Sequence, residues 1–169
     1  RDFHPADVLE DADGSLLLLD TGAWLSWGCP FSELAKPEIK GAIYRIRRSD
    51  ASSPEDPLGL SLKWDEVGKL IQRLTDARPA IRDRAAETLV KVGKPVAEEL
   101  IEALTQSENA DLRRRVVRIL SRIKGEEPKA ALRTALVDVD SGVQQLAVRS
   151  LGTFKDRSAV PALIELFAD

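Results

Sequence analysis

Three arginines at four-residue spacing are the side chains of this chain best placed to bind an anion. Arg114, Arg118 and Arg122 would share one face of a helix over residues 110–124. Such a stripe can contact a protein partner or grip the phosphates of a nucleic acid. We expect a solvated outer face that can serve partner binding. Nucleic-acid binding is the alternative, and it is disfavoured because no aromatic side chains are interleaved to stack on bases.

Two carboxylates, Asp11 and Asp13, precede Gly14 between two apolar runs. Aspartate followed by glycine between apolar segments is typical of a hairpin turn, since glycine accepts the positive φ that a tight turn requires. A calcium loop is the alternative interpretation, but its ninth position would be Leu19, where an acidic ligand is needed. We therefore expect a turn.

The chain contains one cysteine and one histidine, Cys29 and His4. A single cysteine excludes an internal disulfide and a metal site built from several cysteines. We expect Cys29 to be buried or half-buried, with a reactive thiol as the alternative, and His4 to be structural or exposed. No spacing forces two carboxylates together in a pocket that excludes water. We therefore expect no catalytic residue, no cofactor-binding residue, no metal ligand and no activity in the isolated chain.

The elements that position these residues follow from an apolar pattern in the second half. Ile81, Leu112 and Val143 are 31 residues apart, and three further sets repeat this step. The sets are offset by 0, 4, 8 and 11 residues, the spacing of one helix face, so they predict a helical array with a shared core. The further sets are Ala85, Val116 and Ala147; Leu89, Leu120 and Leu151; and Val92, Ile123 and Phe154.

Prolines at first turns, N-cap residues and glycines at helix ends divide the array into helix pairs. These markers are Pro79, Pro95, Pro128, Pro161, Asn109, Asp140, Gly93 and Gly125. The predicted pairs are 64–75 with 79–92, 95–106 with 110–124, and 128–138 with 141–154, followed by a lone helix from about residue 158. One pair cannot bury its own apolar stripe, so the pairs must stack. We predict a mainly α fold, an α-solenoid of about three and a half HEAT-like helix pairs.

The first 48 residues carry a β pattern. Strands are expected on both sides of the Asp-Gly turn and again near residues 41–48. In this last strand Tyr44 and Ile46 share one face, and Arg45 and Arg47 share the other. Three strands leave unpaired edges, so this small β segment is expected to be an incomplete propeller blade.

Two connections complete the predicted organisation. Residues 21–40 form a long loop in which Trp24 and Trp27 cover apolar surface. Residues 49–63 are rich in proline, serine and glycine, and we expect a linker there. The predicted domains are therefore a β segment at 1–48, this linker, and repeats at 64–169.

The bulk composition is that of an ordinary globular chain. The 169 residues have a net charge of −3 and 43 % hydrophobic side chains, which alone do not imply nucleic acid. No apolar run approaches the roughly 20 residues of a membrane span. The sequence contains no methionine, so we expect a piece of a longer chain.

Residues 64–169 resemble short HEAT-type repeats. The closest stretches are Pro79-x-Ile81-Arg82-x-x-Ala85-Ala86-x-x-Leu89 and Ala159-Val160-Pro161-Ala162-Leu163-Ile164-Glu165-Leu166. This resemblance implies an interaction or scaffold module that docks protein partners on an extended surface.

The first 48 residues resemble the closing region of the β-propeller in membrane-bound dehydrogenases of the planctomycete and verrucomicrobial type. The matching stretches are Phe3-x-Pro5-x-Asp7-Val8, Asp11-x-Asp13-Gly14-Ser15-Leu16, Asp20-Thr21-Gly22-Ala23-Trp24, Cys29-Pro30-x-Ser32, Lys36-Pro37 and Gly41-Ala42-Ile43-Tyr44-Arg45-Ile46-Arg47. In that family a propeller similar to glucose/sorbosone dehydrogenases is followed by helical repeats and a c-type cytochrome domain.

This second resemblance implies a joint between a propeller dehydrogenase domain and a following domain. The whole protein would be an extracytoplasmic, periplasmic sugar or alcohol dehydrogenase of bacteria that uses haem c and a quinone. The chain itself lacks Cys-x-x-Cys-His, the haem attachment signature, so no cofactor is assigned to it. The expected partners are proteins or neighbouring domains of the same chain.

Overall fold

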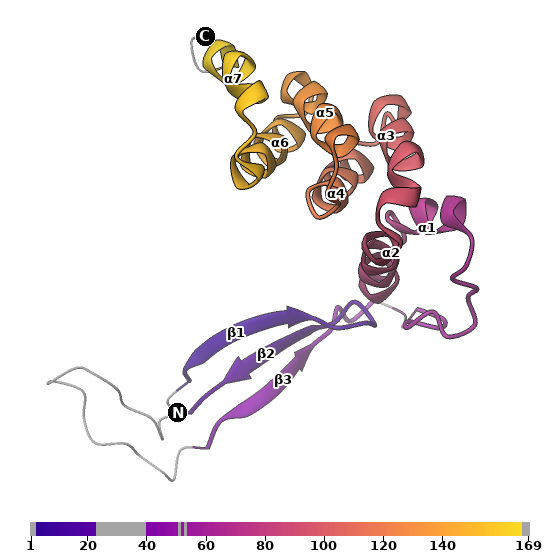
Figure 1. The fold of residues 1–169 in the computed structure, drawn as a ribbon. Helices are drawn as coiled ribbons and strands as arrows, with labels where there is room; N and C mark the ends of the chain where they lie inside the picture. The colour runs from indigo at the N-terminus through magenta and orange to yellow at the C-terminus, as the bar shows by residue number, and fades with distance from the viewer. Residues whose placement is uncertain (1–2, 23–39, 51, 53, 167–169) are drawn as a thin grey trace, which may run out of the picture. The chain divides into compact units, whose positions relative to one another are not determined.

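The computed structural model describes residues 3–22, 40–50, 52 and 54–166. The chain divides into two compact units, one of residues 1–61 with 78–80 and one of residues 62–77 with 81–169. The first unit contains the strands and the second contains nearly all of the helices (Figure 1). The predictions for Trp24, Trp27 and Cys29 lie outside the described residues.

The helices follow the predicted order, with ends that differ by a few residues. Within the described residues the α-helices are α1 (Val67–Arg73), α2 (Pro79–Val92), α3 (Ala97–Gln106), α4 (Ala110–Leu120), α5 (Glu126–Thr134), α6 (Ser141–Phe154) and α7 (Val160–Leu166). Three short 3-10 helices adjoin α3, α5 and α7: Lys94–Val96, Ala135–Val137 and Arg157–Ala159. The structure is therefore mainly helical, as predicted.

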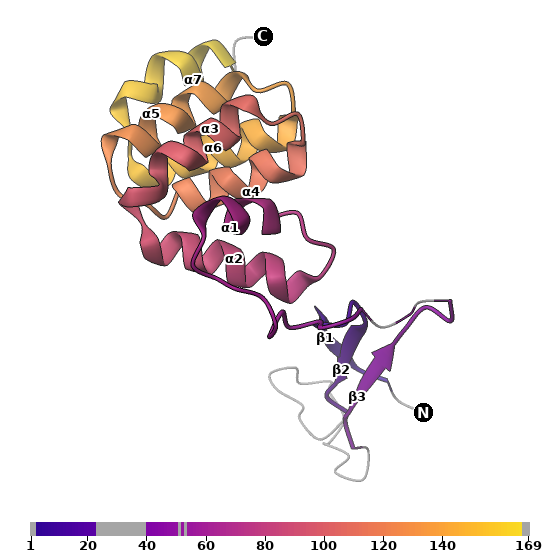
Figure 2. The same ribbon diagram turned by 90° about the vertical axis from the view of Figure 1, so that its right-hand side faces the viewer.

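The helices form two layers (Figures 1 and 2). We call α1, α3, α5 and α7 the odd layer, and α2, α4 and α6 the even layer. Contacts between α3 and α4, and between α5 and α6, join the layers, while contacts between α4 and α6 join neighbours within the even layer. This alternation is the arrangement expected of stacked helix pairs.

The 31-residue ladder forms the core between the layers. The exposed fractions of Leu89, Leu120 and Leu151 are 0 %, 0 % and 1 %, which confirms their predicted burial. Val92 is 41 % exposed, so the ladder fails there. The reason is local: Val92 is the last residue of α2, and Gly93 turns the chain away with a φ of 72°. The odd layer supplies the opposing leucines Leu70, Leu74, Leu100, Leu104, Leu132 and Leu136.

Two predicted N-caps are confirmed. Oδ1 of Asn109 accepts from the N–H groups of Asp111 and Leu112 at 2.9 and 3.2 Å. Oδ1 of Asp140 accepts from the N–H of Val143 at 2.9 Å. Each carboxamide or carboxylate oxygen thus satisfies free amides that begin an even-layer helix.

The β segment is a three-stranded antiparallel sheet in the order β1-β2-β3. Its strands are β1 (Pro5–Glu10), β2 (Leu16–Asp20) and β3 (Ala42–Ile46). Gly14 has a φ of 78°, and the N–H of Asp11 donates to the carbonyl of Ser15 at 2.8 Å. The predicted hairpin is therefore confirmed, with glycine at a position that needs positive φ.

Apolar side chains are exposed on both faces of this sheet. Leu9, Leu19 and Ile43 alternate with the opposite-facing Val8 and Ile46 along the paired strands. Their exposed fractions range from 41 % for Leu19 to 70 % for Ile43. Exposed apolar side chains therefore occur on both faces, beside the polar residues Asp7 and Arg45 on one of them.

Candidate interaction surface

A buried ion pair joins α4 to the loop that precedes α6. Nε and Nη2 of Arg113 donate to Asp138 at 2.8 Å each, and Nη1 donates to the carbonyl of Ser107 at 2.9 Å. The side chains of Arg113 and Asp138 are 8 % and 12 % exposed. Hydrogen bonding to Asp138 raises the pKa of Arg113, and hydrogen bonding from Arg113 lowers the pKa of Asp138. Both groups are therefore held in their charged forms, and the pair fixes one helix pair to the next.

One contact recurs in all three complete helix pairs. A side chain in the first turn of each even-layer helix donates to the carbonyl six residues earlier, at 2.9, 2.9 and 2.7 Å. The donors Arg82, Arg113 and Gln144 are 31 residues apart, as are the acceptors Asp76, Ser107 and Asp138. Each bond ties the loop within a pair to its second helix, satisfying a carbonyl that the loop leaves unpaired. These positions directly follow Ile81, Leu112 and Val143, but the apolar ladder gave no sign of their structural role.

Arg114 and Arg118 of the predicted stripe lie on α4, whereas Arg122 lies two residues beyond Leu120, where α4 ends earlier than the predicted residue 124. The first member of the stripe is bound within the fold. Nε and Nη2 of Arg114 donate to Asp140 at 2.9 and 2.6 Å, and Nη1 donates to Asp111 at 2.6 Å. Hydrogen bonding to Asp140 raises the pKa of Arg114. Gly142 leaves room for this approach, because a Cβ there would lie 2.7 Å from Nε of Arg114. Arg114 is thus already balanced by two carboxylates.

The last member of the stripe is also paired. Nη1 and Nη2 of Arg122 donate to Glu87 at 2.6 and 3.2 Å, joining the turn after α4 to α2. Both side chains are about half exposed, at 49 % and 54 %. The hydrogen bond from Arg122 lowers the pKa of Glu87. Solvent screens such an exposed pair, so a partner carboxylate could displace Glu87 at little cost.

The middle member, Arg118, differs from its neighbours. No hydrogen bond or ion pair joins its side chain to another described residue, and the same is true of Arg149 on α6. Both side chains are exposed. Arg118 and Arg149 are 31 residues apart, so they occupy equivalent positions in consecutive helix pairs. The prediction of a stripe along one helix missed Arg149, although the 31-residue step, followed across helices, could have identified it.

Arg115 lies beside Arg118 on α4 and is half-buried. Burial lowers its pKa, and the positive charges of Arg82 and Arg118 lower it further, against the opposing effect of Asp111 and Asp83. Positive charge is therefore concentrated here. Among the stripe residues, only Arg118 is open to a ligand without first breaking an ion pair within the described structure.

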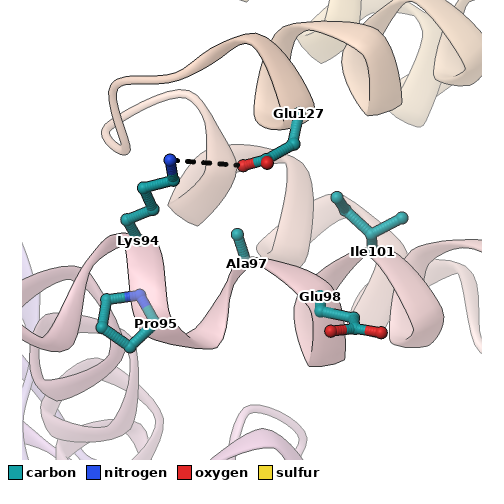
Figure 3. A pocket seen from close by; sticks show the side chains of 6 residues that line it. All are labelled: Lys94, Pro95, Ala97, Glu98, Ile101 and Glu127. Atoms are coloured by element: carbon teal, nitrogen blue, oxygen red, sulfur yellow. Dashed lines mark ion pairs between the residues drawn. The ribbon is translucent and has the colours of Figure 1, made fainter.

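A small hollow lies in the odd layer, between α3 and α5 (Figure 3). Its volume is about 350 Å³, and Ala97, Ile101 and Pro95 supply its apolar lining. Lys94 and Glu127 face each other across it, with Nζ and Oε2 at 4.0 Å. An exposed pair at that separation contributes little stability. Its charged lining residues are Lys94, Glu98 and Glu127.

A larger hollow of about 660 Å³ lies along the loops within the helix pairs. Val137 and Val139 line it and are 78 % and 98 % exposed. Between them, Asp138 is held by Arg113, so the loop that carries the valines is fixed. Two exposed valines on a fixed loop can form a small apolar contact with another protein.

The Asp11–Asp13 pair lies in the hairpin turn and is occupied by arginines. Nη1 of Arg45 lies 2.5 Å from Asp11, and Nη2 of Arg47 lies 2.5 Å from Asp13. Hydrogen bonding from Ser15, aided by Arg47, lowers the pKa of Asp13 to about 2. Arg45 and Arg47 thus share one sheet face, as predicted. The carboxylates serve the turn and the sheet, which agrees with the turn interpretation.

His4 is exposed, and its backbone is hydrogen-bonded to the end of β2 and the residue after it. Its N–H donates to Asp20 at 3.1 Å, and its carbonyl accepts from the N–H of Thr21 at 3.1 Å. Among the described residues, no group of three or more His, Cys, Asp or Glu side chains is arranged to hold a metal ion. None of the described helices is long and apolar enough to cross a bilayer.

The comparisons with known proteins support the repeat architecture. Residues 97–169 match the family model described as HEAT repeats. The match spans α3 to α7, and α1 and α2 lie outside it. A search of curated proteins gives no match to the chain. The helical unit therefore contains HEAT-type repeats, and such repeats suggest a scaffold for protein interaction.

Proposed function

We propose that the helical unit is a scaffold that binds protein partners on the exposed surface of its even layer. The observation that carries this proposal is the pair of exposed, open arginines Arg118 and Arg149, repeated at one position of consecutive helix pairs. Stacked repeats create extended surfaces on which equivalent side chains recur, and such surfaces suit an elongated partner. HEAT-type repeats are typically non-catalytic, in agreement with this role.

Site-specific photo-cross-linking in the native host tests this proposal. A photoreactive phenylalanine at Gln145, an exposed residue of α6, should form a discrete adduct with a protein partner. The same group at Ala130, an exposed residue of α5 in the odd layer, provides the matched control. An adduct of one mass from position 145 alone supports the scaffold function. Identical or absent adducts from both positions would contradict it.

We further propose that the chain is a joint between a propeller dehydrogenase domain and a following domain of an extracytoplasmic protein. Support comes from the sheet, whose apolar residues are exposed on both faces. A propeller blade has a neighbour on each face, so such a composition suits a blade in contact with further blades. The dehydrogenase part of this proposal comes from the resemblance of residues 1–48 to a propeller of that family.

The cofactors of such a dehydrogenase do not fit this chain. Covalent haem attachment needs two cysteines and a histidine in one short motif, and the chain has one cysteine, at position 29, and one histidine, at position 4. Haem c would therefore be held by another part of the protein. The genomic sequence on either side tests the proposal: four-stranded blades before Arg1 and a Cys-x-x-Cys-His motif after Asp169 are expected.

A further inference from the structure

The even layer presents two arginines that the fold leaves open, and we call Arg118 and Arg149 the open arginine pair. Their neighbours on the same surface are bound internally, Arg114 by Asp140 and Arg122 by Glu87. The fold therefore neutralises some arginines and not others. The position of Arg118 is occupied by Glu87 in the preceding helix pair and by Arg149 in the following one. The open arginine therefore recurs in the last two of the three complete helix pairs.

The surroundings of Arg118 strengthen the positive field at this end of the pair. Arg115 is half-buried next to Arg118, and its charge is only partly opposed by Asp111 and Asp83. Positive charges held close together repel one another, and an anion placed among them relieves that repulsion. Guanidinium groups bind carboxylates through paired N–H donors, which gives direction as well as attraction.

We propose that the open arginine pair binds an acidic, extended segment of a protein partner, with one carboxylate on Arg118 and another on Arg149. This proposal rests on the scaffold function and specifies the chemistry of its partner. The contacts between α4 and α6 place the two arginines on adjacent helices of one layer.

Spacing defines the segment further. Packed helices lie about 8–10 Å apart. A chain in the polyproline II conformation rises about 3.1 Å per residue with three residues per turn, so every third side chain lies on one face. Carboxylates three residues apart in the partner therefore match the separation of adjacent even-layer helices. Acidic side chains at every third position should bind better than the same number placed side by side.

A protein segment fits this surface better than a nucleic acid does. Binding through phosphates usually relies on many basic contacts along a continuous track. Here the open pair offers two charges, and Arg114 and Arg122 near Arg118 are already bound to Asp140 and Glu87. The even-layer helices contain one aromatic residue, Phe154, and its ring is covered by Lys129, with Nζ 5.9 Å from the ring centroid. No stacking platform for bases accompanies the arginines on these described helices.

Fluorescence anisotropy with the full chain tests the proposal. The probe is a labelled peptide of about twelve residues with glutamate at every third position and glycine or serine between, long enough to span the layer. Its two comparison peptides carry glutamine at those positions, or the same glutamates in one block. A single-stranded RNA of similar length is the fourth probe. The variant Arg118→Gln/Arg149→Gln is compared with Lys124→Gln/Arg157→Gln, which removes two exposed positive charges outside the even-layer helices.

We expect the spaced acidic peptide to bind, the glutamine peptide not to bind, and the blocked peptide to bind less tightly. The Arg118→Gln/Arg149→Gln variant should weaken binding by about five-fold or more, because each exposed charge pair contributes modestly. The control variant should bind within two-fold of the original, and circular dichroism should show both variants folded. Equal weakening by both variants, no binding of the spaced peptide, or tighter binding of the RNA would overturn the proposal. In any of these cases a specific adduct from position 145 would leave the scaffold function standing, so the two failures are distinguishable.

Discussion

Arg113 of α4 and Asp138 of the next helix pair are joined by two hydrogen bonds of 2.8 Å between side chains that are nearly buried. The same guanidinium donates to Ser107 within its own pair. One side chain therefore ties the loop of its own helix pair and the loop of the following pair together. In a stacked array, where each unit contacts only its neighbours, such a contact couples the stability of adjacent units.

The substitution Arg113→Ala should destabilise the helical unit strongly. It leaves the Asp138 carboxylate buried without its cation, and breaking a buried pair in this way typically costs about 3 kcal/mol or more. The free energy of unfolding from urea titration, followed by circular dichroism, measures the loss. The double variant Arg113→Met/Asp138→Leu should recover part of it, because apolar groups of similar size remove the unpaired charge.

The matched control is Arg122→Ala. Arg122 lies in the turn just after α4 and pairs with Glu87 in an exposed position. Solvent screening makes that pair weak, so its loss should be far smaller than that of Arg113→Ala. An equal decrease in the free energy of unfolding for the two variants would mean that burial does not make the Arg113–Asp138 pair more important than the exposed Arg122–Glu87 pair.

The core ladder gives a second prediction. Leu120 is 0 % exposed, and Leu120→Ala should lower the free energy of unfolding by about 2–5 kcal/mol, the usual range for a buried leucine truncation. Val139→Ala is the control, because Val139 is 98 % exposed and its truncation removes almost no packing. A urea midpoint for Leu120→Ala that matches the control would show that the core lies elsewhere.

Most of the helical fold could be predicted from the sequence because its core repeats. The ladder identified Leu89, Leu120 and Leu151 as core residues, and the caps at Asn109 and Asp140 marked helix starts. Apolar periodicity records burial, since each helix must turn one face to its neighbours. At Val92 the periodicity continued while the helix ended, so the pattern overestimated burial there.

The charged surface could not be predicted in the same way. Arg113, Arg114 and Arg115 are adjacent in the sequence, yet one is buried against Asp138, one is paired with Asp140, and one is half-buried without a hydrogen-bonded carboxylate among the described residues. Successive residues of a helix point about 100° apart, so neighbouring arginines reach different partners. Those partners lie about 25 residues away, and a helical pattern contains no information about contacts across helix pairs.

Acid should destabilise the helical unit through its paired carboxylates. Arg113 lowers the pKa of Asp138, and Arg133 lowers the pKa of Asp156, so both groups have folded-state pKa values below the usual value of 3.8. Such groups contribute stability that is fully present above the unfolded-state pKa and is lost as the pH falls through the folded-state pKa. The free energy of unfolding should therefore be steady from neutral pH to about pH 5 and then decline.

Urea titrations at a series of pH values test this, with Asp138→Asn as the informative variant. Asparagine cannot be protonated in this range. The variant should therefore be less stable at neutral pH, and its free energy of unfolding should fall less on acidification than that of the original chain. Glu98→Gln, at an exposed position of α3, is the control. Its free energy of unfolding should fall with decreasing pH as steeply as that of the original chain. If Asp138→Asn leaves the dependence of the free energy of unfolding on pH unchanged, Asp138 does not contribute to acid sensitivity.

The sheet should be less stable than the repeats when the chain is studied alone. Its strands have open edges, and Val8, Leu9, Ile43 and Ile46 are more than half exposed. Local stability follows buried apolar contact, so amides of β1 and β3 should exchange with solvent well before those of α4 and α6. Hydrogen exchange with mass spectrometry measures this order. Protection of the strands equal to that of α4 would contradict the prediction that the sheet is an incomplete blade.

The last prediction concerns activity, where the dehydrogenase resemblance and the residues of the chain point in different directions. Oxidation of a sugar or alcohol needs a base within hydrogen-bond reach of the substrate and a bound electron acceptor. The exposed His4 uses its backbone, and the Asp11 and Asp13 carboxylates are engaged by Arg45 and Arg47. We therefore expect the purified chain, mixed with pyrroloquinoline quinone and calcium, to reduce no dye with a panel of aldoses and polyols. The complete gene product, assayed in parallel, is the control that shows the assay can detect turnover. Turnover by the chain alone that is abolished by Asp13→Asn would place a catalytic site in the hairpin, and would show that its carboxylates do more than hold the turn.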